Sequence, residues 1–144
     1  MNVNEKGVIG LIEVIRNLTK KGYECFTPVH DYSPVDLIVM NQNFDTKRFQ
    51  IKYREFKEDV IEIGFCSVVN GKKLPIDISA IDGWAVYCAD VDTVCFFSKE
   101  MIKPGSKGFR IRRQPRKKNV DAVPIPLYTD LVDETIVWKV GREA

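Results

Sequence analysis

Histidine is nearly absent from this sequence, and its cysteines lack the spacing that metal sites require. The 144 residues include one histidine, His30, and four cysteines, none of them in a Cys-x-x-Cys pair. Zinc sites of the Cys/His type need closely spaced ligand pairs, and Ser-His-Asp or Cys-His catalysis needs a histidine as base. We therefore expect buried, reduced cysteines and a chemistry that depends on other residue types.

Long apolar segments are also missing. Runs such as Leu37–Met40 are far shorter than the roughly 20 residues of a membrane-spanning helix. The N-terminus reads Met-Asn-Val-Asn-Glu-Lys-Gly, and its charged pair is not typical of a signal peptide. No repeat or linker rich in Pro, Gly or Ser divides the chain. The sequence predicts one soluble, cytoplasmic domain over residues 1–144 that does not contact a membrane.

The net charge of +2 is unevenly distributed along the chain. Residues 103–118 contain eight basic residues and no acidic one, which leaves the other 128 residues with a net charge of −6. A basic segment on a mildly acidic body favours an anionic partner, although an exposed charged loop has the same composition. The eight basic residues are Lys103, Lys107, Arg110, Arg112, Arg113, Arg116, Lys117 and Lys118.

The clearest periodicity is helical and covers residues 4–21. Apolar residues recur at the i, i+3, i+4, i+7 spacing of a helix with one buried face. Asn4 is the expected N-cap, and Gly22 is a suitable residue to end the helix. The residues expected on the buried face are Val8, Leu11, Ile12, Ile15 and Leu18.

Most of the remaining chain has the patterns of short strands. In residues 48–54, polar and apolar side chains alternate, so this strand has one polar and one apolar face. Asn70-Gly71 is a turn signal, and residues 76–83 fit a short helix or a loop. The order of one helix followed by strands indicates an α/β or α+β fold with a mixed central sheet. The expected strands are residues 23–28, 36–40, 48–54, 60–65, 84–88, 93–97, 108–113 and 136–140.

Three polar residues of the second and third expected strands form a candidate site. Asp36 opens strand 36–40, and Gln50 and Lys52 lie on the polar face of the next strand, so a hairpin brings them together. Mg²⁺ prefers oxygen ligands, here the Asp36 carboxylate, the Gln50 side chain and the Ile51 carbonyl. Lys52 could then orient a bound water or stabilise transition-state charge. The alternative is an amphipathic strand with a solvated polar face.

The order of these segments resembles the core of the PD-(D/E)XK nuclease superfamily. The matching segments are the helix, Gly22-Tyr23, Pro28, Asp36-Leu-Ile-Val and Phe49-Gln50-Ile51-Lys52, with Gln50 in place of the usual Asp or Glu. The Gln-x-Lys variant, the chain length and Lys6-Gly7 resemble small bacterial group I intron homing endonucleases. The resemblance is good over residues 5–55 and looser over 76–98, where Ile81-Asp82-Gly-Trp-Ala-Val-Tyr is similar to the family's following strand.

This resemblance implies an α/β fold with a restriction-endonuclease-like core, in which the N-terminal helix packs on a mixed central β-sheet. It implies that Asp36, Gln50 and Lys52 are catalytic and that Mg²⁺ or another divalent cation is the cofactor.

One position departs from the family pattern. Relatives place a metal-facing Glu four residues after Lys-Gly, where this chain has Leu11. Glu13 cannot replace it, because two residues turn a helix by about 200°. Either one well-held metal suffices, or Leu11 is an inactivating substitution. The second interpretation is favoured, because a leucine is a poor neighbour for a hydrated metal.

In a nuclease the basic residues have a partner, double-stranded DNA. Arginines of the expected strand 108–113 could read base edges in the major groove, and Arg48 and Arg54 could hold phosphates beside the cleaved one. Lys72 and Lys73 follow the Asn70-Gly71 turn at a hairpin tip. The full expected DNA-binding set is Arg48, Arg54, Lys72, Lys73, Lys107, Arg110, Arg112, Arg113, Arg116, Lys117 and Lys118.

The expected function is that of a Mg²⁺-dependent, site-specific DNA endonuclease of the homing type, associated with the bacterial nucleoid. A double-strand break needs two active sites, so a chain of this size should act as a homodimer at minimum, or as a homotetramer on a long target. Two alternatives stay open. A Holliday-junction resolvase has the same core and chemistry, and a non-catalytic DNA-binding protein could have kept the fold and lost the helix Glu.

Overall fold

The computed structural model describes residues 1–30, 33–69, 71–101, 107–112 and 122–124. The expected strand 136–140 lies outside these residues. The elements are, in chain order, α1 (Val3–Lys20), β1 (Glu24–Phe26), β2 (Leu37–Met40), β3 (Thr46–Arg54), β4 (Val60–Gly64), β5 (Cys66–Val69), β6 (Lys72–Pro75), η1 (Ile78–Ala80), β7 (Gly83–Cys88), η2 (Ala89–Val91), β8 (Thr93–Ser98), η3 (Lys99–Met101), β9 (Gly108–Arg112) and β10 (Ala122–Pro124). The expected strands in the described part of the chain are therefore present, with ends shifted by a few residues.

Helix α1 has its N-cap two residues earlier than predicted. Asn2, not Asn4, is the N-cap, and its side-chain oxygen accepts a hydrogen bond from the Glu5 backbone N–H at 2.9 Å. The Glu5 carboxylate accepts in return from Asn2 Nδ2 at 2.8 Å. At the other end Gly22 has φ +89°, a left-handed conformation that suits glycine and ends the helix as predicted.

The buried face of α1 is rotated from the one that the apolar periodicity predicts. Gly10, Val14 and Leu18 face the core, whereas Val8 and Ile12 are 57% and 55% exposed. The prediction for Val8 and Ile12 was wrong because it followed the spacing of apolar side chains alone. Gly10 has no side chain, so the pattern did not mark it as a residue that contacts the sheet. Gly10 lies directly over β3, and a Cβ there would be 3.4 Å from the Tyr53 Cβ and 3.7 Å from the Ile51 side chain.

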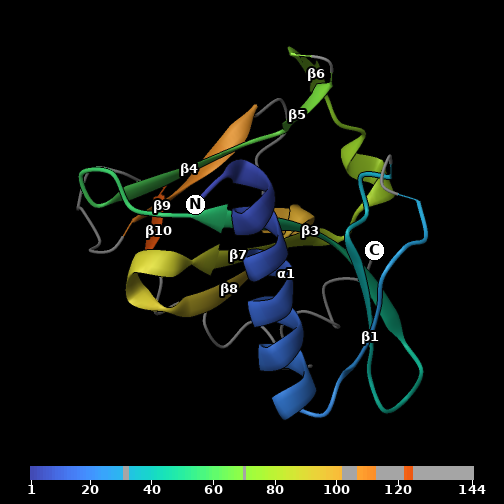
Figure 1. Cartoon of the computed structure of the whole chain (residues 1–144). Coiled ribbons are helices and arrows are strands. Elements are labelled where there is room, and N and C mark those ends of the chain that lie inside the picture. Colours follow the sequence, from blue (N-terminus) through green and yellow to red (C-terminus); the bar gives the residue numbers. More distant parts are fainter. Residues whose placement is uncertain (31–32, 70, 102–106, 113–121, 125–144) are drawn as a thin grey trace.

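The central sheet has five strands in the order β1-β2-β3-β7-β8. Strand β3 pairs in parallel with β7, and the other neighbouring pairs are antiparallel, so the sheet is mixed as predicted. Helix α1 runs across β3, β7 and β8 on one face of this sheet (Figure 1). Gly83 lets β7 approach β8 closely, because a Cβ there would collide with the Phe97 carbonyl. The helix packed on a mixed central sheet is the predicted α/β fold.

A second sheet covers the face opposite α1. It has the order β10-β9-β4, with β9 antiparallel to β4 and parallel to β10. Phe109 of β9 packs against Trp84 of β7 and Phe97 of β8, with ring centroids 5.2 and 4.9 Å apart. Phe65 stacks on Trp84 at 4.9 Å. This aromatic contact joins β9, which carries part of the basic segment, to the central sheet.

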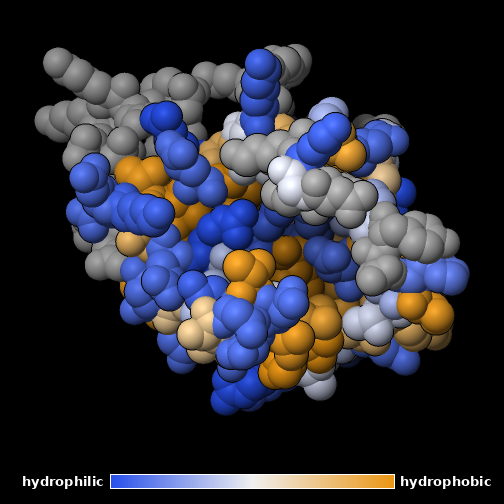
Figure 2. Space-filling model, turned by 45° about the horizontal axis from the view of Figure 1, so that its top comes forward, coloured by the Kyte–Doolittle hydropathy of each residue, from blue (hydrophilic) through white to orange (hydrophobic). Residues whose placement is uncertain are grey.

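Strands β5 and β6 form a separate hairpin, as the Asn70-Gly71 signal predicts. The hairpin projects at the top of Figure 1. Figure 2 turns the top of the molecule forward. On this face, hydrophilic and hydrophobic side chains are mixed around a hollow. Within the described part of the chain, no helix is long and apolar enough to cross a membrane.

Candidate active site

The candidate site lies where β2 and β3 separate. The two strands pair in register from Leu37 opposite Phe49, and the Asp36 backbone N–H still donates to the Phe49 carbonyl at 2.9 Å. At the next position a side chain takes the place of the backbone acceptor. The Asp36 Oδ2 accepts a hydrogen bond from the Ile51 N–H at 2.8 Å. The hairpin therefore fixes Asp36 beside β3, as predicted from the sequence.

Gln50 is a buried amide in the same region, with 6% of its surface exposed. Its Nε2 is 3.5 Å from the Pro34 carbonyl oxygen, which is the limit of a hydrogen bond. Its Oε1 is buried and has no hydrogen-bond partner in the described residues. Buried carbonyl oxygens are normally bonded, so this oxygen is suited to a ligand, and a divalent cation is one that amide oxygens bind.

Asp36 and Lys52 are both half-buried, and burial shifts the pKa of each towards its neutral form. Desolvation raises the pKa of Asp36, while the Ile51 N–H and the Lys52 charge act in the opposite direction. Desolvation lowers the pKa of Lys52 and the Arg54 charge lowers it further, whereas Asp36 and Cys66 raise it. Such shifts in a carboxylate and an ammonium that influence each other are typical of functional sites.

The donor set matches a metal site with few protein ligands. Within the described ranges no three His, Cys, Asp or Glu side chains come together to hold a metal ion. The available donors are the Asp36 carboxylate, the Gln50 oxygen and the Ile51 carbonyl. All three are oxygen atoms, which suits a hard cation such as Mg²⁺, and Mg²⁺ commonly keeps several waters.

Comparison with known families and structures identifies the family and the fold of this chain. The family model described as PD-(D/E)XK endonuclease matches residues 1–123. The chain belongs to the PD-(D/E)XK endonuclease family. The solved structure of a bacterial homing endonuclease, I-Ssp6803I, superposes with a TM-score of 0.69 at 12% identity, over 100% of this chain and 99% of that one. At this identity the likeness shows the fold alone. A search of curated proteins finds no match.

Membership in the PD-(D/E)XK family makes the chain a nuclease, and a nuclease of this family has DNA as its substrate. Nucleases of this family generally use divalent metals. The resemblance noted in the sequence places the family's motif on Asp36, Gln50 and Lys52, and this assignment stays a prediction.

Leu11, where a Glu is expected, is half-buried and packs against the hydrophobic core. Helix α1 lies on the face of β3 that carries Ile51 and Tyr53, and side chains alternate along a strand, so Gln50 and Lys52 point to the opposite face. A side chain at position 11 can therefore approach Asp36 only past the edge where β2 and β3 separate.

Arg48 and Arg54, expected at DNA phosphates, each have a partner within the protein. The Arg48 guanidinium bonds the Asp82 carboxylate through Nε at 3.2 Å and Nη2 at 3.3 Å, and Asp82 also accepts from the Arg48 backbone N–H at 2.8 Å. Arg54 Nη1 donates to the Tyr53 carbonyl at 2.8 Å, and burial lowers its pKa. This role of Asp82 was not predicted from the sequence, although Asp82 stands in the quoted Ile81-Asp82-Gly segment.

The other expected DNA contacts are exposed or undescribed. Lys72 lies exposed at the β5–β6 hairpin and Lys73 follows it in β6. Lys107 is exposed, and Arg110 on β9 forms an exposed ion pair with Glu62 of β4 at 3.3 Å. Arg112 ends β9. Lys103, Arg113, Arg116, Lys117 and Lys118 lie outside the described residues.

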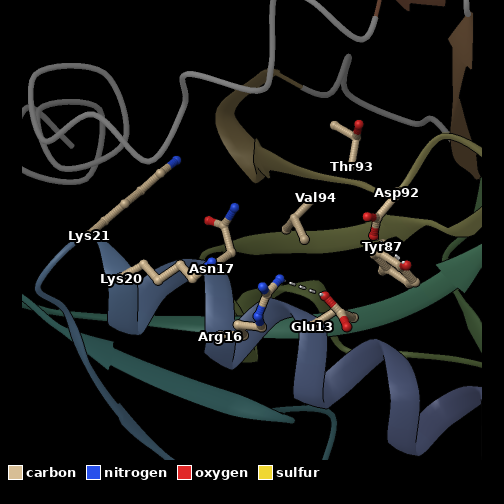
Figure 3. Close-up of a pocket in the computed structure, with 9 residues that line it drawn as sticks. All are labelled: Glu13, Arg16, Asn17, Lys20, Lys21, Tyr87, Asp92, Thr93 and Val94. Carbon is tan, nitrogen blue, oxygen red and sulfur yellow. Dashed lines mark hydrogen bonds and ion pairs between the residues drawn. The ribbon is translucent and has the colours of Figure 1, made fainter.

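A pocket of about 310 Å³ lies elsewhere, between α1 and the β7–β8 hairpin (Figure 3). Among its lining residues, Arg16 pairs with Glu13 at 3.8 Å, and the Tyr87 hydroxyl donates to Asp92 at 2.7 Å. The hydrogen bond to Asp92 raises the pKa of Tyr87 to about 12. The pocket lies on the α1 side of the sheet, away from the Gln50 side chain, and Asp36, Gln50 and Lys52 are not among its lining residues.

Proposed function

We propose that this nuclease is a Mg²⁺-dependent, site-specific DNA endonuclease of the homing type. The observation that carries the proposal is the buried Gln50 Oε1, without a partner in the described structure, beside the Asp36 carboxylate. A strand with a merely solvated polar face would not bury an acceptor in this way. The similar solved structure, I-Ssp6803I, is that of a bacterial homing endonuclease, and the match covers 100% of this chain.

Asp36, Gln50 and the Ile51 carbonyl would hold the cation. When bound, the ion supplies Lewis-acid polarisation of the scissile phosphate and a water of lowered pKa. Asp36 is held for this role by the Ile51 N–H, which leaves its second carboxylate oxygen available. Lys52 provides positive charge beside the phosphate, where negative charge develops in the transition state. Its partial burial strengthens that interaction because the surrounding dielectric is lower.

Residues 103–118 would supply most of the affinity for the DNA backbone. If Arg110, Arg112 and Arg113 contact phosphates, replacing them with Ala should lower the slope of log K against log salt by about 0.9 for each lost contact. A base contact would appear as a loss of about 1–3 kcal/mol of discrimination at one base pair. Arg16→Ala, which removes an exposed arginine of α1, is the matched control. An unchanged slope would mean that these arginines belong to an ordinary charged surface that does not bind DNA.

The smallest active assembly is a homodimer, because one chain carries one site and a double-strand break needs two. A long target would require a homotetramer. The protein would act on DNA in the bacterial cytoplasm, in association with the nucleoid.

Leu11 favours one alternative, a DNA-binding protein without catalysis, because the family's usual helix carboxylate is missing. A Holliday-junction resolvase is the alternative within the same chemistry. The choice of substrate separates the resolvase from the homing activity, and binding without cleavage identifies the non-catalytic protein.

The test is incubation with a randomised duplex library and with a four-way junction, in Mg²⁺ and in Ca²⁺, using the unsubstituted chain, Leu11→Glu and Asp36→Asn. The proposal expects cleavage of a restricted set of duplex sequences in Mg²⁺ and none with Asp36→Asn. Preferential cleavage of the junction would instead identify a resolvase. Binding without cleavage by both the unsubstituted chain and Leu11→Glu would identify a non-catalytic DNA-binding protein.

A further inference from the structure

Two buried polar atoms without partners in the described residues occupy neighbouring positions in the central sheet. One is the acceptor Gln50 Oε1, and the other is the donor Trp84 Nε1. Gln50 and Trp84 are register partners in the parallel pair β3–β7, so their side chains point to the same face of the sheet. One water that accepts from the indole N–H and donates to the amide oxygen would satisfy both atoms.

An amide ligand needs an orientation that a carboxylate does not. The two oxygens of Asp or Glu are equivalent, whereas a glutamine presents either an oxygen or an NH₂ group, and the NH₂ group cannot bind a cation. The Pro34 carbonyl accepts from Gln50 Nε2, but at 3.5 Å this contact is weak. A second group that discriminates between the two ends of the amide is therefore required for a Gln at this position.

Trp84 meets the requirements for that second group. Its indole N–H can only donate, so a shared water accepts this bond and keeps both of its hydrogens to donate, which favours the amide oxygen over the NH₂ group as its next partner. Its ring is fully buried, and it is held between Phe65, stacked at 4.9 Å and 19°, and Phe109, edge-on at 5.2 Å. A ring held on two sides in this way keeps its N–H in one direction.

We propose that Trp84 is a positioning residue of the candidate metal site, whose indole N–H, through a shared water, holds the Gln50 amide with its oxygen towards the cation. The proposal rests on the function proposed above. It explains how this chain uses Gln50 where the superfamily usually has a carboxylate. It also connects the aromatic cluster around Phe109 on β9 to the orientation of a metal ligand.

The first experiment tests the pairing in the protein without metal. The chain contains two tryptophans, Trp84 and Trp138, so an NMR spectrum of ¹⁵N-labelled protein can show two indole N–H signals. A Trp→Phe variant of each residue assigns its signal. Gln50→Ala should move the Trp84 indole signal and accelerate its hydrogen exchange. A Trp84 signal that is indifferent to Gln50→Ala would overturn the proposal.

The second experiment measures Mg²⁺ binding by calorimetry with the metal alone. Trp84→Phe keeps the stacked ring and removes the N–H, so it should weaken Mg²⁺ binding by about fivefold, the effect of one hydrogen bond. In a Gln50→Glu background the same change should have no effect, because the two carboxylate oxygens are equivalent. Phe65→Leu disturbs the same cluster and keeps the N–H, and it is the packing control. An equal loss in both backgrounds would show general damage and would contradict the positioning role.

The two proposals fail in different ways. If the indole signal responds to Gln50→Ala but no DNA is cut in Mg²⁺, the proposed endonuclease function is wrong and the pairing stands. If DNA is cut and the indole signal does not respond, Trp84 is an ordinary core residue and the function stands.

Discussion

Strand β3 presents Ile51 and Tyr53 to α1 on one face and Gln50 and Lys52 on the other, and the two faces differ in what burial does. On the helix face, Gly10 allows close contact between apolar surfaces, which stabilises the fold. On the polar face, burial leaves one acceptor unpaired in the described structure and lowers the pKa of an ammonium group. One strand therefore carries a stabilising face and the face of the proposed site, which we call the reactive face, separated by the alternation of its side chains.

Asp36→Asn should have the largest effect, on the reactive side alone. We expect Mg²⁺-dependent cleavage to fall about 10³-fold or more, since metal-assisted stabilisation is worth several kcal/mol and each 1.36 kcal/mol is tenfold. The fold should persist, because an amide oxygen can still accept from the Ile51 N–H. Single-turnover cleavage and thermal melting on one sample measure both. Asp59→Asn, at an exposed turn with positive φ, is the control. Unchanged cleavage in Asp36→Asn would remove the site assignment.

Gly10→Leu should act on the stabilising side alone. A side chain at position 10 must displace Ile51 or Tyr53, so we expect a loss of about 2 kcal/mol in the free energy of unfolding. Gly7→Leu introduces the same residue on the same helix, where a Cβ meets nothing within 4 Å, and it should stabilise by about 0.5–1 kcal/mol. Denaturant titration of both variants gives the difference. Equal values for the two would mean that α1 does not pack on β3 through Gly10.

Leu11→Glu tests whether the helix contributes to the reactive face. One charge-assisted contact is worth about 1.5–3 kcal/mol, so a carboxylate that reaches the site should raise the rate of Mg²⁺-dependent cleavage by about tenfold or more. Leu11→Gln has the same length without the charge and should not raise it. The opposite result, a lower melting temperature with no gain in cleavage, would show that position 11 belongs to the core.

Lys52→Met should have the smallest effect, and it should depend on pH. Because the folded-state pKa of Lys52 lies below its ordinary value, the fold favours the neutral amine, and the charged form destabilises it at neutral pH. The variant should therefore be more stable at pH 7, by on the order of 1 kcal/mol. The difference should shrink as the pH rises through the lowered pKa towards 10.5. Melting curves of both proteins, from pH 7 up to the highest pH at which they stay folded, would measure this difference in stability. A constant difference would contradict the burial of the charge.

Local pattern was enough to predict the helix, the β2–β3 hairpin and the positions of Asp36, Gln50 and Lys52. These residues lie within one hairpin, so their proximity follows from short-range pairing. The rotation of α1 was missed because Gly10, the residue in closest contact with β3, has no side chain to mark it as apolar.

The contribution of Trp84 could not be predicted either. Its position next to Gln50 depends on the register of β3 against β7, which no local signal determines. The link between Arg48 and Asp82 has the same origin, since these residues are 34 apart in the chain.

That parallel β3–β7 pairing has a consequence for the order in which the protein forms. Helix α1 and strands β1, β2 and β3 follow one another in the chain and are connected by short loops. Strands β4, β5 and β6 lie between β3 and β7 in the chain, so the pairing of β7 with β3 closes a longer loop. Closing the longer loop has the greater entropic barrier, so it belongs to the slow part of folding. During synthesis, Asp36, Gln50 and Lys52 leave the ribosome well before Trp84. A newly made chain would thus carry the acidic, amide and basic groups of a nuclease for some time before it gains the strand that orders them.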